Sequence, residues 1–373
     1  MTTQADPALR QHMFALAPLR VWLRLLREHG GVAPRRRGAL ARILLTSLGT
    51  LPLRLAESAI HGRRVRRTPI ETPPVMILGY GRSGTTHLHN LLVCDPDHAG
   101  VTTYQAIAPA CCLVGRRFLE PLIARQLPAK RPMDNMDVSL DLPQEEEIAI
   151  AGLSHQSFLH HLSFPRAARR CYDRYAAMQG LTPREIERWE RTYLDVVRKA
   201  TVIAGGRRLV LKSPSNLARV PHILRLFPGA KFVHIVRNPY VVYRSLTHMF
   251  RRILPPNQLQ EIAWEEFEEH ILHAYERSMR RYLADRFRIP PGQLTEVRFE
   301  DLETRPLHEL QRVYADLSLP DWERARDHFA EYLGPRATYR KNRYGLDQAV
   351  IDRVDARWRF AVDAWSYTPP ETG

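Results

Sequence analysis

The sequence predicts an α/β protein in which a central parallel sheet is flanked by helices. Three apolar, β-rich runs carry this prediction, at Val75–Leu78, 209–211 and Lys231–Val236. A helical pattern follows the first run, and another, starting near Ser215 and ending at Pro228, separates the second run from the third. Strands and helices in this order pair their strands in parallel. The length of 373 residues and the 44% hydrophobic content support a sizeable core.

The first strand leads into a glycine-rich turn that predicts a phosphate-binding loop. Glycines let backbone N–H groups turn toward an anion, and the helix that follows adds the positive end of its dipole. The spacing Gly79 to Gly84 copies the loop of P-loop NTPases, except that Thr85 stands where a lysine bridges the β- and γ-phosphates. We therefore expect a P-loop NTPase-like fold whose ligand carries one 5′ phosphate with a sulfuryl group, rather than ATP. The predicted donor-binding residues here are Gly81, Arg82, Ser83, Gly84, Thr85 and Thr86.

Two further strands end in a cation. Lys212 follows the run 209–211, and Arg237 follows Lys231–Val236. Because the carboxyl ends of parallel strands face the ligand crevice, both side chains are expected at the site made by the glycine turn. Asn238 predicts a helix N-cap and Pro239 the first helical residue, which places Ser245 on that helix. Arg237 and Ser245 together suit a second phosphate, such as the 3′ phosphate of a nucleotide.

The remaining elements are mostly helical. Thr182, Pro183 and Glu185 form a capping-box start for a helix that runs to about residue 203. A second long helical pattern covers 258–286, a late strand is expected at 295–299, and Asp301 opens the next helix. Residues 1–72 are expected to form a helical N-terminal extension, and residues 73–373 the main domain.

These motifs resemble those of the sulfotransferases that use 3′-phosphoadenosine 5′-phosphosulfate (PAPS). Residues 81–86 resemble the family's 5′-phosphosulfate loop, and Arg237 with Ser245 its 3′-phosphate motif. The resemblance is strongest to a mostly bacterial group, and it extends from about residue 73 to 365. The matching blocks lie at 82–88, 131–136, 143–147, 211–214, 297–302 and 344–346.

The resemblance implies a role for each matched residue. Residues 81–86 would bind the 5′ phosphosulfate, and Arg237 and Ser245 the 3′ phosphate. Lys212 corresponds to a lysine that approaches the sulfuryl group and the leaving oxygen, where a cation stabilises growing negative charge. A looser match implies that a basic loop contributes to the 3′-phosphate site, although a solvated loop is the alternative. That loop contains Arg340, Lys341 and Arg343.

The general base is less clearly marked. Where the tyrosylprotein sulfotransferases have a glutamate after the phosphate-loop helix, this chain has Thr102 and Thr103. Carboxylates in the acidic run 144–147 are the best remaining bases, and Glu145 and Glu147 are preferred as catalytic residues. A solvated acidic helix start is the alternative. Histidines are competing bases, namely His87, His89, His155, His160 and His161.

Composition excludes several other classes. Cys94, Cys111, Cys112 and Cys171 lack zinc-site spacing and do not suggest a disulfide framework, so we expect neither a metal site nor a secreted protein. The N-terminus also lacks the apolar core of a signal peptide, and a cytoplasmic location is expected. The net charge of +15 invites a nucleic-acid role, but the arginines are spread along the chain without a recognised motif. No nucleic-acid partner is therefore expected.

The N-terminal segment raises the question of membrane contact. Basic residues 35–37 precede an apolar run at 43–53, which is shorter than the ~20 residues needed to span a bilayer. A basic helix at the membrane surface and a helix packed on the catalytic domain both remain open.

We therefore expect a PAPS-dependent sulfotransferase that transfers a sulfuryl group, by in-line displacement, to a hydroxyl or amine. A small-molecule, lipid or carbohydrate acceptor is compatible with the sequence, because the fold does not determine the acceptor. The alternatives are a P-loop phosphotransferase and a nucleotide-binding protein without catalysis.

Overall fold

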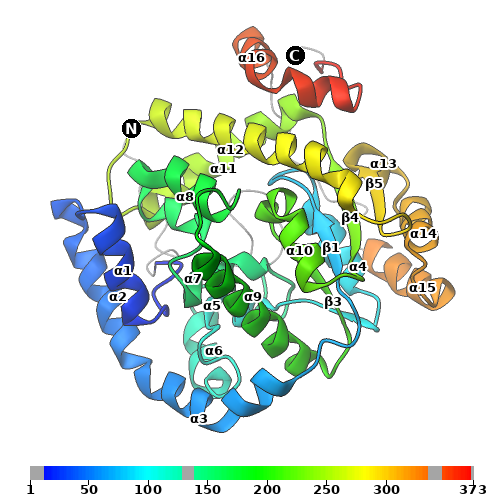
Figure 1. The fold of residues 1–373 in the computed structure, drawn as a ribbon. Helices are drawn as coiled ribbons and strands as arrows, with labels where there is room; N and C mark the ends of the chain where they lie inside the picture. Colours follow the sequence, from blue (N-terminus) through cyan, green and yellow to red (C-terminus); the bar gives the residue numbers. More distant parts are fainter. Residues whose placement is uncertain (1–11, 128–137, 335–346, 371–373) are drawn as a thin grey trace. The chain divides into compact units, whose positions relative to one another are not determined.

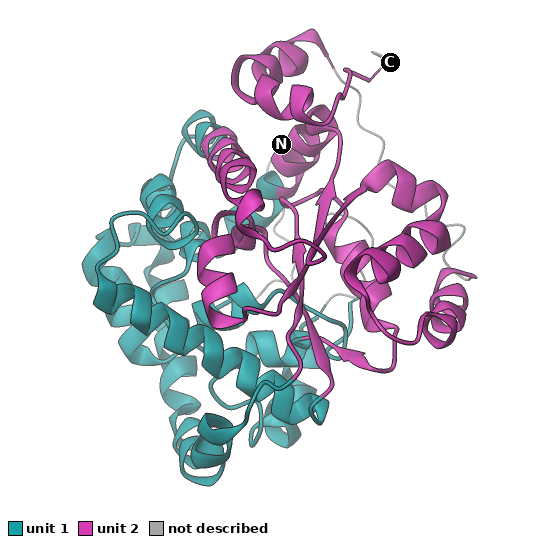
Figure 2. Ribbon diagram, turned by 45° about the vertical axis from the view of Figure 1, so that its right-hand side comes forward, with its two compact units in different colours: residues 1–71, 101–206, 250–270 teal, residues 72–100, 207–249, 271–373 magenta. Residues whose placement is uncertain are grey.

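The computed structural model describes residues 12–127, 138–334 and 347–370. The chain forms two compact units, each assembled from separate stretches of sequence (Figure 2). Unit 1 contains residues 1–71, 101–206 and 250–270, and unit 2 contains residues 72–100, 207–249 and 271–373. The predicted division at residue 72 into an extension and a main domain stays a prediction.

Unit 2 is built on a five-stranded sheet in which every pair of neighbouring strands is parallel. The strands are β1 (Val75–Leu78), β2 (His98–Ala99), β3 (Arg208–Lys212), β4 (Lys231–Val236) and β5 (Leu294–Arg298). Their order across the sheet is β2-β3-β1-β4-β5, so β1 lies at the centre. All four residues of β1 are buried, as the apolar run predicts.

Helices cover both faces of this sheet (Figure 1). Alternate strand residues such as Val75, Ile77 and Val233 form one apolar core with α4 (Thr85–Val93), α14 (Pro306–Leu317) and α15 (Trp322–Leu333). On the other face, the His234 ring stacks on Tyr282 of α12 (Trp264–Asp285) at 4.0 Å. A parallel sheet needs such cover because its strands are apolar on both sides. The predicted α/β arrangement is therefore present.

The order of the strands defines a crevice. From β1 the chain passes through α4 to β2 on one side of the sheet, whereas from β4 it continues to β5 on the other side. The direction of winding thus reverses between β1 and β4. Ligands of open α/β sheets bind at such a reversal, beyond the carboxyl ends of the strands.

The other elements near the sheet differ slightly from the prediction. The helix expected from Ser215 is split into a 3-10 turn, η5 (Pro214–Ala218), and α10 (Val220–Leu226), because Pro221 lacks the N–H that a continuous helix would bond to the preceding turn. The pattern at 258–286 becomes a helix only from Trp264. The remaining elements of this part are α11 (Pro239–Asn257), η6 (Arg286–Arg288), α13 (Phe299–Thr304) and α16 (Gln348–Ala364).

Unit 1 is helical over its described residues. Its longest helix, α9 (Pro183–Ala204), begins with the predicted capping box between Thr182 and Glu185 and ends at Gly205. An apolar cluster around Tyr104 and Leu119 forms a core between shorter elements. These are α5 (Thr103–Ile107), α6 (Arg116–Ala124), α7 (Glu146–Leu153), η3 (Phe158–Leu162), η4 (Pro165–Ala167) and α8 (Ala168–Tyr175).

The N-terminal part of unit 1 is helical, as predicted. It contains α1 (Leu19–His29), η2 (Pro34–Arg36), α2 (Arg37–Gly49) and α3 (Leu51–Arg67). By length and composition alone, the continuous helical stretch Pro34–Arg67 could cross a membrane. It is long enough, and part of it is apolar enough. Only 17% of its most apolar window is buried.

Candidate active site

The turn between β1 and α4 has a backbone that requires glycine at two positions. A Cβ atom on Gly79 would lie 2.9 Å from the Ile235 carbonyl oxygen of β4, so the turn packs directly on the neighbouring strand. Gly84 has a φ of 89°, and a Cβ atom there would collide with the Phe299 ring. Gly84 is also the N-cap of α4. The turn is thereby held close to β4 and β5.

Arg82, Arg237 and Ser245 converge on this turn. Arg82 adopts a left-handed conformation with a φ of 72°, which is uncommon for a residue with a side chain. Its Nε donates a hydrogen bond to Ser245 Oγ at 2.9 Å, and Arg237 Nη1 donates to the Arg82 carbonyl oxygen at 3.1 Å. The Arg237 guanidinium also lies 4.2 Å from the centre of the Phe299 ring. Two guanidinium groups are thus fixed at the reversal between β1 and β4.

The start of α4 supplies further donors. Ser83 and Thr85 are buried and Thr86 is half-buried, in the turn and the first helical residues. The first N–H groups of a helix have no partner within the helix, and together with the dipole they attract an anion. Gly81 lies between the two glycines that shape the turn, and a Cβ atom there would be in ordinary contact with Leu246. The predicted donor-binding residues 81–86 therefore form one continuous anion-attracting turn.

Lys212 is the last residue of β3, paired in register with Ile77 of β1, and only 2% of its surface is exposed. The lysine and the glycine turn thus leave the carboxyl ends of adjacent strands. Burial first, and then the positive charge of Lys212, lower the pKa of His89 to about 3. The His89 ring is therefore neutral, and its Nε2 donates to the Val210 carbonyl oxygen at 3.0 Å.

The acidic run lies in unit 1 at the start of α7. Glu145 is the half-buried N-cap residue, and Glu146 and Glu147 are fully buried in the first turn. Glu147 accepts a hydrogen bond from Ser157 Oγ at 2.6 Å, and Glu146 accepts one from the Tyr193 hydroxyl at 3.1 Å. This burial differs from the solvated helix start that the sequence left open. Glu145 and Glu147 belong to a different unit from the glycine turn.

Burial makes His155, His160 and His161 poorly suited as bases. Burial lowers the pKa of His160 and of His161 to about 3, and it also lowers the pKa of His155. A base with so low a pKa takes up a proton weakly near neutral pH. His161 Nδ1 lies 2.9 Å from His270 Nε2, in a buried pair within unit 1.

Two residues that follow strands β3 and β5 are not among those predicted from the sequence. Arg219 is fully buried, and its Nη1 donates to Ser215 Oγ at 2.9 Å, shortly after Lys212 in the chain. Its apolar neighbours Leu217 and Val220 could have marked it, since arginine is almost never buried unless it is paired. Phe299, directly after β5, packs on Gly84 and Arg237. Its position directly after a strand is the signal in the sequence that could have identified it.

Some predicted features lie outside the described residues. These are the block 131–136 and the basic residues Arg340, Lys341 and Arg343. Among the residues that the structure does describe, no group of three or more His, Cys, Asp or Glu side chains could hold a metal ion.

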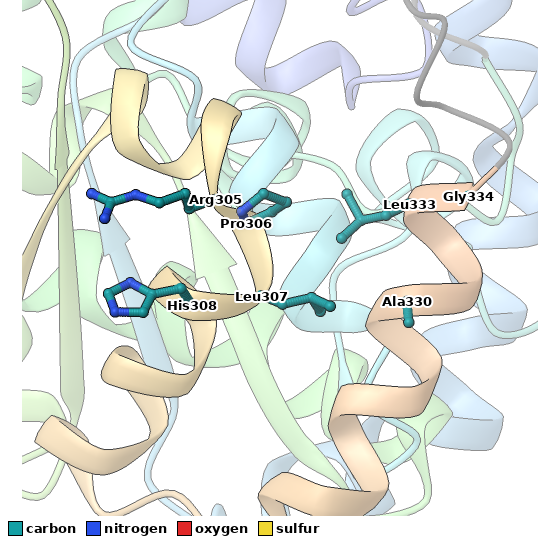
Figure 3. A pocket seen from close by; sticks show the side chains of 7 residues that line it. All are labelled: Arg305, Pro306, Leu307, His308, Ala330, Leu333 and Gly334. Atoms are coloured by element: carbon teal, nitrogen blue, oxygen red, sulfur yellow. The ribbon is translucent and has the colours of Figure 1, made fainter.

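A hollow of about 430 Å³ lies elsewhere in unit 2, between α14 and α15 (Figure 3). Leu307, Ala330 and Leu333 line it, and the Arg305 and His308 side chains point away from α15. None of the predicted site residues borders this hollow.

Comparison with known proteins identifies the family. The model of the sulfotransferase family matches residues 73–324. The chain is also 34% identical over 348 residues to omega-hydroxy-beta-dihydromenaquinone-9 sulfotransferase Stf3 of Mycobacterium bovis and of Mycobacterium tuberculosis, covering 93% of this chain and 89% of the relative. The chain belongs to the sulfotransferase family. It is an enzyme that transfers a sulfuryl group to an acceptor.

Solved structures support the fold of this sulfotransferase. STF9 from Mycobacterium avium superposes with a TM-score of 0.65 at 19% identity, covering 90% of this chain and 87% of the other. STF1 from Mycobacterium tuberculosis gives a TM-score of 0.63 at 18% identity, covering 90% of each chain. The predicted P-loop NTPase-like α/β fold is confirmed.

Proposed function

We propose that this sulfotransferase takes its sulfuryl group from PAPS and transfers it to a hydroxyl group of a lipid. One observation carries the donor assignment, namely the convergence of Arg82, Arg237 and Ser245 on the glycine turn. Two fixed guanidinium groups beside a helix N-terminus suit a ligand with two separate phosphates better than a single small anion. PAPS has this distribution of charge.

The two ends of the donor are assigned to different residues. The amides and hydroxyls of residues 81–86 bind the 5′ phosphosulfate, and Arg237 and Ser245 bind the 3′ phosphate. The existing hydrogen bonds of Arg82 to Ser245 and of Arg237 to the turn support this assignment, because they hold the cations in place before the donor arrives. The absence of a lysine at Thr85 argues against a P-loop phosphotransferase.

The proposed reaction is a direct in-line displacement. The acceptor oxygen forms a bond to sulfur while the bond from sulfur to the bridging phosphate oxygen breaks. The electron pair of the broken bond remains on that oxygen, and adenosine 3′,5′-bisphosphate leaves. Lys212 stabilises the negative charge that grows there, and the carboxylate of Glu145 or Glu147 takes the acceptor's proton.

The lipid acceptor is inferred from the relatives. The Stf3 proteins are named for a hydroxylated menaquinone derivative, and this chain is 34% identical to them over 93% of its length. A hydroxylated isoprenoid lipid is therefore the first acceptor to test, ahead of phenols, carbohydrates and small alcohols or amines. Such a lipid resides in a membrane. We therefore propose a cytoplasmic enzyme whose basic N-terminal segment contacts the membrane surface.

The test incubates the full chain with sulfur-labelled PAPS and a panel of acceptors, including detergent-dispersed hydroxylated isoprenoid quinones. We expect a labelled lipid sulfate and an equal amount of adenosine 3′,5′-bisphosphate. Transfer only to a sugar or phenol would contradict the lipid assignment. Transfer of phosphate from Mg²⁺-ATP would revive the phosphotransferase alternative.

The base is tested by Glu145→Gln and Glu147→Gln, with Glu146→Gln as the control in the same turn. Loss of one proton acceptor is expected to lower kcat by about 10²- to 10⁴-fold in one of the two test variants. The control should keep its activity because Glu146 is not one of the proposed bases and the glutamine oxygen can still accept the hydrogen bond from the Tyr193 hydroxyl. Full activity in both test variants would exclude these residues as bases.

A further inference from the structure

Helices α2 and α3 expose apolar residues and bury polar ones. Five large side chains on their outer side are between 43% and 67% exposed, whereas Ser47, Thr50 and Glu57 are at most 6% exposed. This is the reverse of the usual pattern for a helix on a water-soluble surface. We call the five exposed side chains the outer leucine face: Leu45, Leu48, Leu51, Leu55 and Ile60.

The exposed residues follow helical spacing. Positions 41, 45, 48, 52, 55 and 59 alternate steps of four and three residues, and all six are exposed and lack charge. Residues with this spacing share one side of a helix. Leu51 and Ile60 widen the stripe. The outer leucine face is therefore a periodic feature across both helices rather than a set of scattered exposed leucines.

The polar side of α2 and α3 is held against other elements of unit 1. Glu57 accepts hydrogen bonds from Lys199 Nζ and from the Leu113 N–H, both at 2.8 Å. Arg54 donates to Thr50 Oγ1 at 2.6 Å and to the Ser47 carbonyl oxygen at 2.8 Å. Turning the helices to bury the leucines would break the buried Glu57–Lys199 pair, which is strongly unfavourable. The exposure of the leucines is thus imposed by the packing of unit 1.

The charge around this face is strongly positive. The stretch Pro34–Arg67 contains nine arginines and one acidic residue, Glu57, which points into the protein. The exposed arginines flank the apolar face toward both ends of the stretch, at Arg37, Arg42, Arg63, Arg64, Arg66 and Arg67. An apolar stripe bordered by exposed cations is complementary to an anionic lipid surface.

We propose that the outer leucine face inserts into the interface of an anionic membrane while the flanking arginines bind lipid phosphates. This inference rests on the proposed function, since an enzyme that acts on a membrane lipid must reach it. A transmembrane arrangement is disfavoured because only 11 residues separate Arg42 from Arg54, against ~20 needed to cross a bilayer. The anchored Glu57 would also have to leave its partners.

The experiment measures sedimentation of the full chain with vesicles, in the absence of donor and acceptor. Vesicles of phosphatidylcholine with phosphatidylglycerol are compared with vesicles of phosphatidylcholine alone. We expect the chain to bind the anionic vesicles. Salt should remove this binding, and PAPS should not be required for it. Because no turnover is measured, the result stands apart from the identity of the acceptor.

Two sets of substitutions separate the contributions. The triple variant Leu45→Gln, Leu48→Gln and Leu55→Gln should bind anionic vesicles at least about 100-fold more weakly. Replacing Arg63, Arg64 and Arg67 with Gln should weaken binding about fivefold per arginine, on anionic vesicles only. Phe287→Gln is the matched control, since Phe287 is 80% exposed but lies in unit 2. Glutamine favours helices, so the folds should be kept.

Turnover provides a second measurement, which separates loss of membrane binding from loss of the fold. The leucine variant should keep full turnover on a detergent-dispersed acceptor and lose it when the same acceptor is in vesicles. Unchanged vesicle binding by the leucine variant would overturn the proposal. Wild-type protein that stays in vesicles after alkaline carbonate washing would also overturn it, because this result indicates a spanning helix. A stable dimer that the leucine variant abolishes would overturn it as well.

Discussion

The glycine turn of unit 2 and the outer leucine face of unit 1 are both rich in arginine, yet they hold it differently. At the turn, Arg82 is bound to Ser245, and Arg237 is bound to the backbone and lies against Phe299. On α2 and α3, Arg63, Arg64 and their neighbours are exposed around leucines. The first arrangement fixes cations at defined points, and the second spreads them over a surface.

This difference separates two kinds of anion recognition. Fixed cations in a partly desolvated site select a ligand of one shape, because their geometry is set before binding. Exposed arginines on flexible stems attract any anionic surface and are screened by salt. In our proposals, the same residue type therefore serves donor binding in one unit and surface attraction in the other.

The largest effect is expected at Lys212, which we propose acts on the chemical step. Lys212→Ala should lower kcat by about 10²- to 10³-fold, the usual cost of removing one stabilising group from a transition state. Affinity for adenosine 3′,5′-bisphosphate, measured by calorimetry, should change far less. A loss of affinity equal to the loss of kcat would contradict a catalytic role for Lys212 and would indicate a role in donor binding.

The next effect concerns the shape of the turn. Gly84→Ala forces a side chain into a positive φ and against the Phe299 ring, and should destabilise the protein by about 2–4 kcal/mol. Gly205→Ala is the matched control, since Gly205 also has a positive φ but a Cβ atom there would have no neighbour within 4 Å. Thermal unfolding should show a clearly larger loss for Gly84→Ala. Equal losses would mean that the Phe299 contact is not restrictive.

A smaller effect is expected at Arg237. Arg237→Ala should weaken the binding of adenosine 3′,5′-bisphosphate by about 10- to 100-fold, since a charged hydrogen bond contributes about 1.5–3 kcal/mol. Arg298→Ala tests the same kind of ring contact at the next strand end, where Arg298 lies 4.4 Å from the centre of the Tyr367 ring. The control should bind normally. Normal binding by Arg237→Ala would contradict its assignment to the 3′ phosphate.

The smallest effect on donor binding should come from salt. Raising the ionic strength from about 0.1 to about 1 M shortens the screening length from about 10 to about 3 Å. Vesicle binding should then fall more than about tenfold, whereas bisphosphate affinity, measured in parallel by calorimetry, should fall only a few-fold. Equal sensitivity of the two would show that the turn and the outer leucine face do not differ in the way described.

The elements around the turn could be predicted because their signals are local. Val75–Leu78 is a buried strand, Asn238 Oδ1 accepts from the Tyr240 N–H at the start of α11, and Thr182 caps α9. Each depends on residues within one helical turn or one strand. The sequence predicted one helix from Ser215, because an apolar helical pattern does not register the N–H that Pro221 lacks.

The sequence predicted that Arg237 lies at the glycine turn, but the individual contacts between distant segments could not be predicted. Nothing in the sequence states that Arg237 reaches the Arg82 carbonyl oxygen, 155 residues away, or that Phe299 lies beneath Gly84. The full burial of Glu146 and Glu147 was equally hidden, because a run of carboxylates is solvated in most helix starts. Such contacts depend on how the elements pack.

By itself the sequence determined the α/β class, the glycine turn, the cations at two strand ends and the family of enzyme. The first three follow from residue type and spacing, which act over a few residues, and the family follows from the resemblance of its motif blocks. The sequence predicted that Arg237 and Ser245 lie at the glycine turn, and the tertiary structure alone decided the hydrogen bonds that join them to Arg82. It alone also decided that leucines face outward on α2 and α3 while Glu57 faces inward. The reason is that convergence and burial belong to the packed chain, where the partners of one residue come from remote parts of the sequence.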